Sequence, residues 1–455
     1  MTHSESWSSR FIFLLASIGA AVGLANIWKF PYTAGEHGGG GFVLIYLVAI
    51  ALISFPILTV EFMLGRRGQS DPVGAIVKVA KEAKRSPLWS LAAYAGIVAS
   101  VLTMSFYFVI TGWIIYYALQ IALGNLSGLS SDEIGGFFQQ LTESEHVSAI
   151  FHSLSIFITF VVVAAGLKNG VEKCVRYLMP LLFVLMLAFC IYALVYGDIQ
   201  AATGFLFQVK PGDITSKTLL YAAGQAFFTV GAGGCVMIVY GSYLSRSVSI
   251  MKSSMQIVLA DTMIALMAGM AIFPLVFAHQ LEPAEGPGLL FVTLPIIFSQ
   301  SAAGSVLGAI FFFMVAIAAL TSAIAIVQAP IVWLERQLSV NRITTSAIVT
   351  CIIWLLGFGT ICSFDSCASF YPLSFVPGFQ NLTTFAVMEM LAINICLPLG
   401  SLLLAIFVGW RLPVDILKQE LAENSPRVFA YWFFCIRYVV PPAILMILLF
   451  GLFSE

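Results

Sequence analysis

The stretch Gly19-Ala-Ala-Val-Gly-Leu-Ala-Asn26 interrupts one long hydrophobic segment near its midpoint, and Gly231-Ala-Gly-Gly234 interrupts another, five spans later. A helix broken in the middle of a bilayer leaves backbone N–H and C=O groups unpaired where there is no water. Such a break persists only where it lines a cavity whose contents pair those groups. Paired breaks at corresponding positions of two halves indicate the binding site of a secondary transporter. The alternative is that small residues only let helices pack closely, but polar or charged neighbours at both breaks favour a binding site.

The composition is that of a membrane protein. Sixty per cent of the chain is hydrophobic, 9% is charged and the mean hydropathy is +0.99, which excludes an ordinary soluble domain. About twenty apolar residues cross a bilayer. We therefore expect eleven spans, at approximately 11–34, 41–64, 89–123, 149–167, 174–197, 217–243, 255–279, 305–335, 344–362, 384–410 and 428–452.

The charges are distributed unevenly between the loops. Six Lys and Arg lie in the loop after the second span, at 66–85, whereas the loop after the third, at 132–145, carries four acids and no Lys or Arg. If alternate loops share a side, all of the 21 Lys and Arg except Lys29, Lys210 and Lys217 fall on one side. The positive-inside rule makes that side cytoplasmic. We expect a multi-pass protein of the inner (plasma) membrane, with its N-terminus in the cytoplasm and its C-terminus outside.

Several other classes of function find no support in the sequence. No phosphate-binding loop is present, which argues against an ATP-driven pump, and the five His suggest no metal site.

The eight Cys lie mostly within spans and are interpreted as packing residues, although Cys362 and Cys367 share an outer loop and could form a disulfide. The first apolar run leads into Lys29 without a small-residue cleavage site, so no signal peptide is expected. The segment from Gly286 to Gln300 predicts a short helix over an outer vestibule.

Seven motifs together resemble the neurotransmitter:sodium symporter family. In chain order they are Trp7-Ser-Ser-Arg10, Gly19-Ala-Ala-Val-Gly-Leu-Ala-Asn-Ile-Trp-Lys-Phe-Pro-Tyr32, Glu36-His-Gly-Gly-Gly-Gly41, Lys168-Asn-Gly-Val-Glu-Lys173, Gln225-Ala-Phe-Phe-Thr229, Leu294-Pro-Ile-Ile-Phe-Ser299 and Leu320-Thr-Ser-Ala-Ile-Ala-Ile-Val-Gln328. The resemblance implies the all-α LeuT fold, in which two inverted five-helix repeats, here 11–197 and 217–410, surround a central site. It also implies a cytoplasmic N-terminal gate segment, 1–10, and a peripheral eleventh helix, 428–452.

Three polar residues inside apolar spans point to a cation. They are Asn26, Thr229 and Asp261. An intramembrane acid costs at least a few kcal/mol unless it is paired, and no Lys or Arg is expected at a comparable depth. A bound Na⁺, a hard ion that prefers oxygen ligands, is the natural partner. The alternative for Asp261 is a protonated acid that hydrogen-bonds between helices.

The resemblance implies two sodium sites. The first comprises the carbonyl of Ala21, the side chains of Asn26, Thr229 and Asp261, and the carboxylate of the substrate. The second comprises the carbonyls of Gly19, Val22 and Ala318 with the hydroxyls of Thr321 and Ser322. Because Thr and Ser in helices often bond to their own preceding turn, the assignment of Thr321 and Ser322 rests on the resemblance.

The resemblance also implies an amino-acid substrate. Gly23 occupies the place where monoamine-transporting relatives carry an acid, which leaves room for a substrate carboxylate near the backbone N–H groups of Leu24 and Ala25 and the hydroxyl of Tyr107. A half-helix N-terminus favours an anion there. The full substrate set is Ala21, Gly23, Leu24, Ala25, Thr103, Tyr107, Phe228, Thr229, Gly231, Gly234, Ser322 and Ile326. Gly234 replaces a Phe of a leucine-preferring relative, which favours a medium or large neutral side chain, although the broken helix could also move inward and fill that space.

The gates depart from the family pattern. Lys29 and Glu389 replace the usual Arg and Asp of the outer gate, so we expect a weaker, water-bridged pair. At the inner gate Trp7, Tyr243 and Gln328 match, whereas Arg336 stands where the family has an Asp. Two arrangements are possible here: Glu5 and Arg336 form a charge-reversed pair, or Glu5 is solvated and Arg336 faces the lipid headgroups. Glu61 matches a family acid that hydrogen-bonds near the first break, and a structural role is expected for it.

We interpret the chain as a Na⁺-coupled symporter that imports a neutral, hydrophobic or aromatic amino acid, and not as an enzyme. Independence of chloride is expected, because Asp261 supplies the negative charge and Ala265 lacks a hydroxyl to hold the anion. A symporter for glycine or a small β- or γ-amino acid and a non-transporting amino-acid sensor remain alternatives; a channel would need a continuous polar stripe, which the sequence lacks. The expected partners are the amino acid and the lipid bilayer, with no nucleic acid and no obligate protein.

Overall fold

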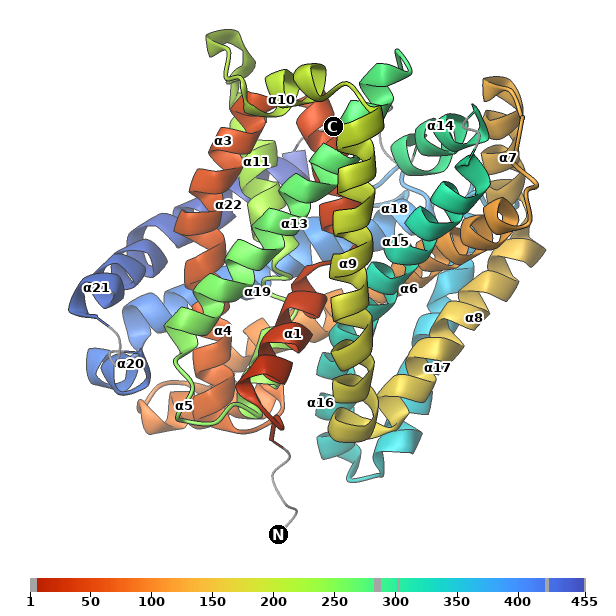
Figure 1. Ribbon diagram of the computed structural model, residues 1–455. Coiled ribbons are helices and arrows are strands. Elements are labelled where there is room, and N and C mark those ends of the chain that lie inside the picture. The colour runs from red at the N-terminus through yellow and green to blue at the C-terminus, as the bar shows by residue number, and fades with distance from the viewer. Residues whose placement is uncertain (1–5, 282–287, 301–302, 422–424, 454–455) are drawn as a thin grey trace.

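The computed structural model describes residues 6–281, 288–300, 303–421 and 425–453, and all secondary structure in these ranges is helical (Figure 1). Nine helices are long and apolar enough to cross a membrane within the described residues. They are Gly40–Gly68, Pro87–Ala122, Glu145–Ala164, Leu167–Tyr196, Ile250–Ala278, Gly304–Leu338, Arg342–Cys362, Thr384–Arg411 and Pro426–Leu452. Each coincides with one of the expected spans.

The two remaining expected spans are the interrupted ones. The first consists of α1 (Arg10–Ala21) and, after Val22 and Gly23 leave the helix, the continuous segment Ala25–Glu36, bent by 53° from α1. The second, expected at 217–243, consists of α11 (Ser216–Thr229) and α12 (Val236–Ser242). Neither half of it is long enough to cross a bilayer alone, so the two halves form one span only together.

The intact spans are built from the following elements. They are α3 (Gly40–Ala49), η2 (Ile50–Ser54) and α4 (Phe55–Gly68); η3 (Pro87–Ser90) and α6 (Leu91–Ala122); α8 (Glu145–Ala164); η4 (Leu167–Val171) and α9 (Glu172–Tyr196); α13 (Ile250–Ala278); α15 (Gly304–Ile326) and α16 (Gln328–Leu338); α17 (Arg342–Cys362); α18 (Thr384–Glu389), η7 (Met390–Cys396), α19 (Leu397–Ile406) and η8 (Phe407–Arg411); and α21 (Pro426–Phe434), η9 (Cys435–Val439) and α22 (Val440–Phe453). The outer half of the first span is η1 (Ala25–Lys29) and α2 (Phe30–Glu36).

Short helices connect the spans. They are α5 (Pro72–Glu82), α7 (Ser131–Glu143), α10 (Ile199–Phe207), η5 (Pro211–Asp213), η6 (Leu289–Thr293), α14 (Leu294–Gln300) and α20 (Val414–Leu421). The helix expected to end at Gln300 is confirmed from Leu289 onwards, while Gly286 and Pro287 lie outside the described residues. Cys362 and Cys367 are free thiols.

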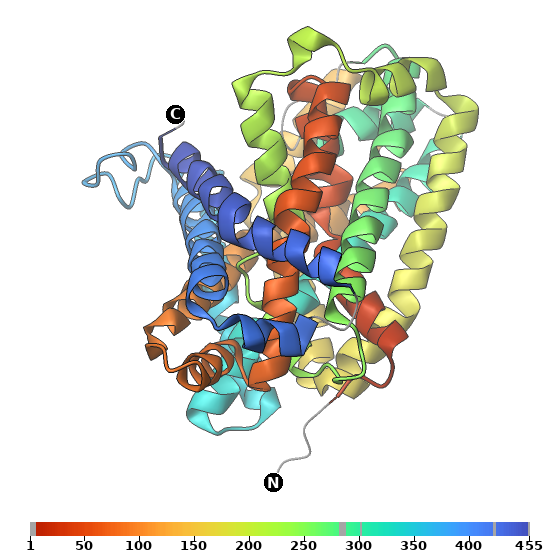
Figure 2. The same cartoon turned by 90° about the vertical axis from the view of Figure 1, so that its left-hand side faces the viewer.

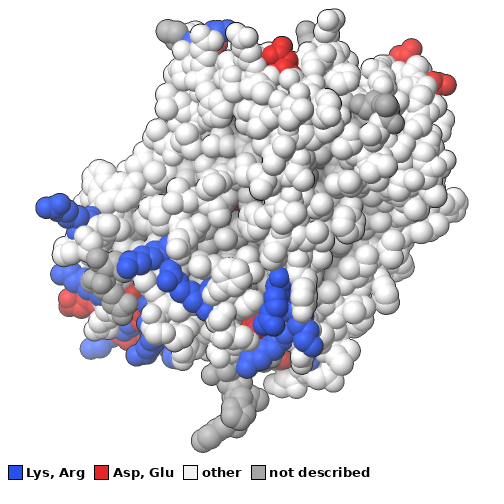
Figure 3. Space-filling view, in the orientation of Figure 1, with Lys and Arg blue, Asp and Glu red and all other residues white. Residues whose placement is uncertain are grey.

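The broken spans lie at the centre of the bundle. α1 packs against α9, α13 and α15, and α12 packs against α4. Span eleven packs from the side on span ten and α11, and Figure 2 shows it on the outside of the bundle. α1 begins at one end of the molecule and α22 ends towards the other (Figure 1). Figure 3 shows Lys and Arg gathered at the end where α1 begins, which agrees with the uneven loop charges.

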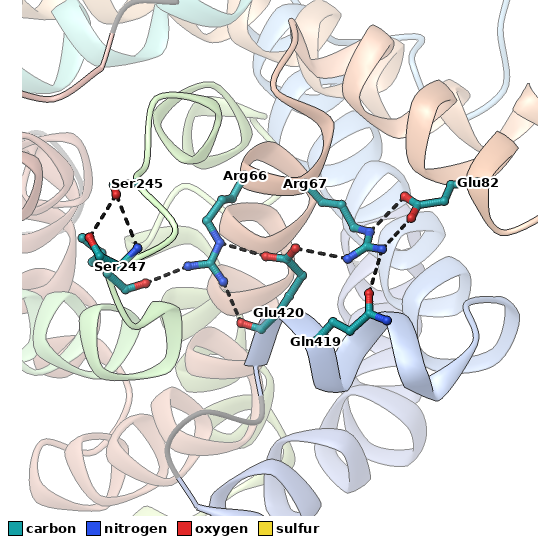
Figure 4. A network of polar contacts seen from close by, with 8 residues as sticks. Arg66, Arg67, Glu82, Ser245, Ser247, Gln419 and Glu420 are labelled. Atoms are coloured by element: carbon teal, nitrogen blue, oxygen red, sulfur yellow. Dashed lines mark hydrogen bonds and ion pairs between the residues drawn. The ribbon is translucent and has the colours of Figure 1, made fainter.

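A network of ion pairs joins four segments at that basic end (Figure 4). Arg66, at the end of α4, pairs with Glu420 of α20 at 2.8 Å and donates to the carbonyls of Glu420 and Val248, both at 2.7 Å. Arg67 bridges Glu420, at 3.1 Å, and Glu82 of α5, at 2.5 Å. Arg66 and Glu420 are buried, whereas the Glu82 side chain is 46% exposed. The Arg67 guanidinium lowers the pKa of the Glu82 carboxyl through its hydrogen bonds.

We expect Glu420→Gln to destabilise the protein by about 3–5 kcal/mol, because it leaves the buried charge of Arg66 uncompensated. Glu82→Gln, the matched control at the exposed end of the same network, should change stability by about 0–1 kcal/mol. Thermal unfolding of the purified variants in one detergent measures both. Equal melting temperatures for Glu420→Gln and the parent would show that the buried pair contributes nothing.

Candidate functional site

Both breaks meet a buried carboxylate at the centre of the bundle. Asn26 donates through Nδ2 to Asp261 Oδ1 at 2.8 Å and to Thr229 Oγ1 at 3.1 Å. Thr229 donates to Asp261 Oδ2 at 2.8 Å. All three side chains are buried, and in the described part of the chain no Lys, Arg or His nitrogen lies within 4.0 Å of Asp261. Three of the four residues predicted for the first cation site, Asn26, Thr229 and Asp261, are thus in contact. Their carboxylate, hydroxyl and amide oxygens are a donor set that fits a hard cation.

The backbone of the first break is bonded by two side chains, one from the break itself and one from α6. The N–H of Gly23 donates to Asn26 Oδ1 at 3.3 Å, and the N–H of Leu24 donates to the hydroxyl of Tyr107 on α6 at 3.5 Å. A Cβ at Gly23 would lie 3.0 Å from both Tyr107 Oη and Ser322 Oγ. A glycine is required here because any side chain would displace the two hydroxyls.

The second break owes its shape to glycines. Gly231 and Gly233 have φ of +62° and +83°, a region that only glycine adopts without strain. A Cβ at Gly231 would meet no atom within 4 Å, and one at Gly234 would meet only ordinary contacts beyond the adjacent carbonyl of Gly231. Space therefore adjoins this break near Phe228, on the side where the substrate side chain was expected.

Glu61 bonds to the second break rather than the first. Its Oε1 accepts from the N–H of Gly233 at 2.7 Å. The expected structural role agrees with this contact, but the expected position near the first break is wrong. The reason is that the α4 helix packs directly on α12, whose first turn follows Gly233.

Thr103 and Ile326 belong to the predicted substrate set and lie on different helices, α6 and α15. Thr103 lies one turn before Tyr107 on α6, and its buried hydroxyl has no hydrogen-bond partner among the described residues. Ile326 is half-buried at the end of α15. The Thr103 hydroxyl is therefore a buried polar group without a hydrogen-bond partner among the described residues. A group of this kind is available to contact a ligand.

The residues of the predicted second sodium site lie on α1 and α15, which pack together. Thr321 donates to the carbonyls of Ile317, at 3.0 Å, and Ala318, at 3.1 Å, in its own preceding turns. Ser322 donates instead across the interface to the carbonyl of Ala20 at 3.4 Å. Ala20 was not predicted to take part. Gly19 is needed for packing, since a Cβ there would lie 2.8 Å from Met179 Sδ, while Val22 caps α1.

A cavity of about 550 Å³ opens next to the site, on the side of Lys29 and Phe228. It is lined by Lys29, Glu36, Tyr221, Gly224, Phe228 and Asn394, among others. The Lys29 ammonium lies over the Phe228 ring, 4.6 Å from its centroid. Lys29 and Glu389 form no ion pair within 4.0 Å in the described structure, although the Glu389 charge acts on Lys29. The cation–π contact was not predicted. Lys29 and Phe228 lie 199 positions apart in the sequence, and only the fold brings them together.

At the basic end of the bundle, the N-terminal segment packs on α12. Trp7 donates through its indole N–H to the carbonyl of Tyr240 at 3.0 Å and meets the Tyr243 ring edge-on, 6.3 Å between centroids. Gln328 accepts from Arg342. Arg336 donates to Ser70 and pairs with Asp71 at 3.5 Å. The hypothetical partner Glu5 lies outside the described residues.

One inner contact was missed entirely. Ser8 donates its backbone N–H, at 3.0 Å, and its hydroxyl, at 2.5 Å, to the carboxylate of buried Glu172 at the start of α9. Glu172 belongs to the motif Lys168-Asn-Gly-Val-Glu-Lys173, so the signal was present but indicated no partner. This clamp holds the N-terminal segment against the fifth span.

Two broken helices that meet at a buried acid inside a bundle of long apolar helices, with a cavity on the side of Lys29, are the arrangement of a membrane transporter of the LeuT fold. The crystal structure of MhsT in complex with L-phenylalanine aligns with a TM-score of 0.89 and 36% identity, over 98% of this chain and 99% of that one. An uncharacterized sodium-dependent transporter of Bacillus subtilis, YhdH, is 36% identical over 97% of this chain and 96% of its own. Another uncharacterized sodium-dependent transporter, from Haemophilus influenzae, is 32% identical over 99% of this chain and 98% of its own.

A sequence model of the Sodium:neurotransmitter symporter family matches residues 4–131 and 137–455. The chain therefore belongs to this family of sodium-dependent transporters. The predicted family and fold are confirmed, as is the interpretation as a transporter rather than an enzyme.

We expect Glu389→Gln to favour outward-open states, because it removes the charge that attracts Lys29 across the outer passage. The probe is Gly224→Cys, in a background whose accessible native Cys are replaced by Ser, since a Cβ at Gly224 meets open space in the cavity. Labelling by a membrane-impermeant maleimide should be faster in Glu389→Gln. Glu36→Gln, another acid of the same cavity, is the control. An unchanged rate, or an equal increase in the control, would contradict a gating role for Glu389.

Proposed function

We propose that this transporter imports a neutral amino acid together with Na⁺ by alternating access. The observation that carries the proposal is the buried Asn26–Thr229–Asp261 cluster between the two breaks, because it places a carboxylate, without a cation from the described residues beside it, near the open space at Gly231 of the second break. A cation there offsets the cost of an intramembrane acid. MhsT, 36% identical, was crystallised with L-phenylalanine, which supports an amino acid as the ligand class.

The first Na⁺ would be held by Asp261, Thr229, Asn26 and the carbonyl of Ala21. In the present structure the Asn26 amide donates N–H groups to Asp261 and Thr229, so binding requires this amide to turn its oxygen towards the ion. The second Na⁺ would use the carbonyls and hydroxyls of the α1–α15 interface. There the Thr321 and Ser322 hydroxyls must exchange their present carbonyl partners for the ion.

The substrate carboxylate would lie near Gly23, where Leu24 N–H and the hydroxyl of Tyr107 already converge. Its oxygens would complete the first sodium site, which couples substrate binding to ion binding. The amine would meet carbonyls around Phe228 and Gly231. The side chain would extend towards Thr103 and Gly234, next to the open space at Gly231, and this favours a medium or large side chain such as an aromatic one.

Coupling to Na⁺ supplies the driving force. If the basic end faces the cytoplasm, with the N-terminus inside and the C-terminus outside, the cavity next to Lys29 faces the medium. Each positive charge that moves inward gains about 2.3 kcal/mol per 100 mV of membrane potential. Two Na⁺ would therefore contribute about 4.6 kcal/mol, enough for more than a thousandfold accumulation at about 1.4 kcal/mol per decade.

The test is uptake of labelled amino acids into proteoliposomes with an inward Na⁺ gradient, using phenylalanine, leucine, glycine and β-alanine. We expect uptake of the larger neutral substrates in Na⁺ and none in K⁺. Asn26→Ala should raise the Na⁺ concentration needed for half-maximal binding, whereas Thr262→Ala, which removes a buried hydroxyl that donates to the carbonyl of Val258 in its own helix, should not. Na⁺-dependent binding without uptake would favour a sensor, and preference for glycine or β-alanine would favour the alternative symporter.

We also propose that transport needs no chloride. Chloride-dependent animal relatives hold the anion at positions that correspond here to Tyr46, Gln225, Thr229, Asp261 and Ala265. The Tyr46 hydroxyl and Gln225 Oε1 are buried without hydrogen-bond partners in the described structure, so polar groups adjoin this space, but Asp261 already places a carboxylate beside it. Two anions a few ångströms apart would repel by several kcal/mol at an effective dielectric near 20.

Replacing chloride by gluconate should therefore leave uptake unchanged, because the fixed carboxylate takes the place of the anion. Asp261→Asn combined with Ala265→Ser is expected to make residual uptake depend on chloride. Initial rates of uptake in both media measure this. A parent protein that stops in gluconate would refute chloride independence.

A further inference from the structure

Arg437 is a cation inside a hydrophobic helix, and no acid among the described residues pairs with it. It lies in the membrane-crossing helix Pro426–Leu452, on η9. Among the described residues no carboxylate lies within 4.0 Å of its guanidinium and no acceptor hydrogen-bonds it, and its Nε is buried without a partner. A charge in such a helix is costly unless something pairs with it. No described residue supplies an anion within reach of the guanidinium, which leaves this position open to a partner from outside the chain.

Aromatic side chains fix the position of this guanidinium. Its carbon lies 4.7 Å from the centroid of the Trp410 ring and 5.5 Å from that of Tyr438. The indole N–H of Trp410 donates to the carbonyl of Arg437 at 3.0 Å. Gly409 permits this approach, since a Cβ there would lie 3.2 Å from Arg437 Cα. The rings hold the cation without neutralising its charge.

The surroundings are those of a bilayer interface. Trp410 is the second-last residue of the span Thr384–Arg411, so Arg437 is held level with the end of that span. Trp410, Phe434 and Tyr438 are each more than half exposed, as in the aromatic belts where membrane proteins meet headgroups. The adjacent Arg411 accepts through its carbonyl from Arg85, which adds positive charge. A lipid phosphate is the anion available at this depth.

We propose that Arg437, with Trp410 and Tyr438, binds the phosphate of an anionic phospholipid headgroup between spans ten and eleven. The chemistry is that of any phosphate anion, which a guanidinium receives through two parallel hydrogen bonds. The lipid is favoured over a free phosphate because the rings beside the guanidinium are exposed on a face of span eleven that is mostly not covered by protein. Acyl chains would lie along these rings while the headgroup meets the cation.

The test is native mass spectrometry of the purified full-length protein, titrated with dioleoyl-phosphatidylglycerol, with dioleoyl-phosphatidylcholine or with inorganic phosphate. We expect a discrete adduct of phosphatidylglycerol that Arg437→Gln weakens roughly tenfold or more, as for a lost charge-assisted contact. Arg427→Gln removes an exposed arginine at the start of the same helix and should leave the affinity within about twofold of the parent.

Unchanged affinity in Arg437→Gln would overturn the proposal, as would an equal loss in Arg427→Gln, which would indicate a diffuse basic surface. Displacement of the lipid by millimolar inorganic phosphate would assign the site to free phosphate instead and overturn the lipid assignment. Equal affinity for phosphatidylcholine would show that no anionic headgroup is selected. Should Arg437→Gln not fold, Arg437→Lys replaces it, with a smaller loss expected because Lys lacks the planar fork.

Discussion

A backbone amide inside a bilayer must find its partner within the protein or in a bound ligand, because lipid offers none. In this chain the two breaks satisfy that constraint with side chains, most of them from other helices. Asn26 bonds to Gly23, Tyr107 to Leu24 and Glu61 to Gly233, and Ser100 bonds to the carbonyl of Gly234 at 3.0 Å. The breaks are therefore joined to α4 and α6, and the centre of the bundle is ordered by the need to pair unwound backbone.

If the proposed ion and substrate bind here, the same hydrogen bonds would make the arrangement of the broken helices depend on them. Asn26 and Tyr107 now bond to backbone or to neighbouring side chains, and both are groups that an ion or a carboxylate would use. A ligand that binds here exchanges partners with groups already at hand, so little desolvation is added. Each exchange also changes what holds α1 relative to α6 and α13, which are separate elements of the bundle. Binding and rearrangement of the broken helices are therefore linked by the same few hydrogen bonds.

The sequence predicts the parts of this arrangement that depend on local chemistry. Glycine runs mark both breaks, since left-handed backbone at Gly231 and Gly233 needs glycine, and a lone acid such as Asp261 in an apolar span signals a partner. Pairings between distant segments carry no such signal. Glu420 is 354 positions from Arg66, and Glu172 is 164 from Ser8. From the sequence alone, Glu420 and Glu172 could each be solvated residues near a helix end. Only the fold shows that both are buried and paired.

The outer passage shows how a residue change alters the physics of a gate. An Arg would meet an acid with two parallel hydrogen bonds, whereas Lys29 is a compact charge that finds the face of Phe228 instead. A cation–π contact of this kind contributes about 0.5–1 kcal/mol when exposed and more when desolvated. It also couples the charge to the ring that lies next to the expected substrate position. Displacement of Phe228 by a ligand would therefore release Lys29 towards Glu389, and the closing of the outer side would follow from occupation of the site.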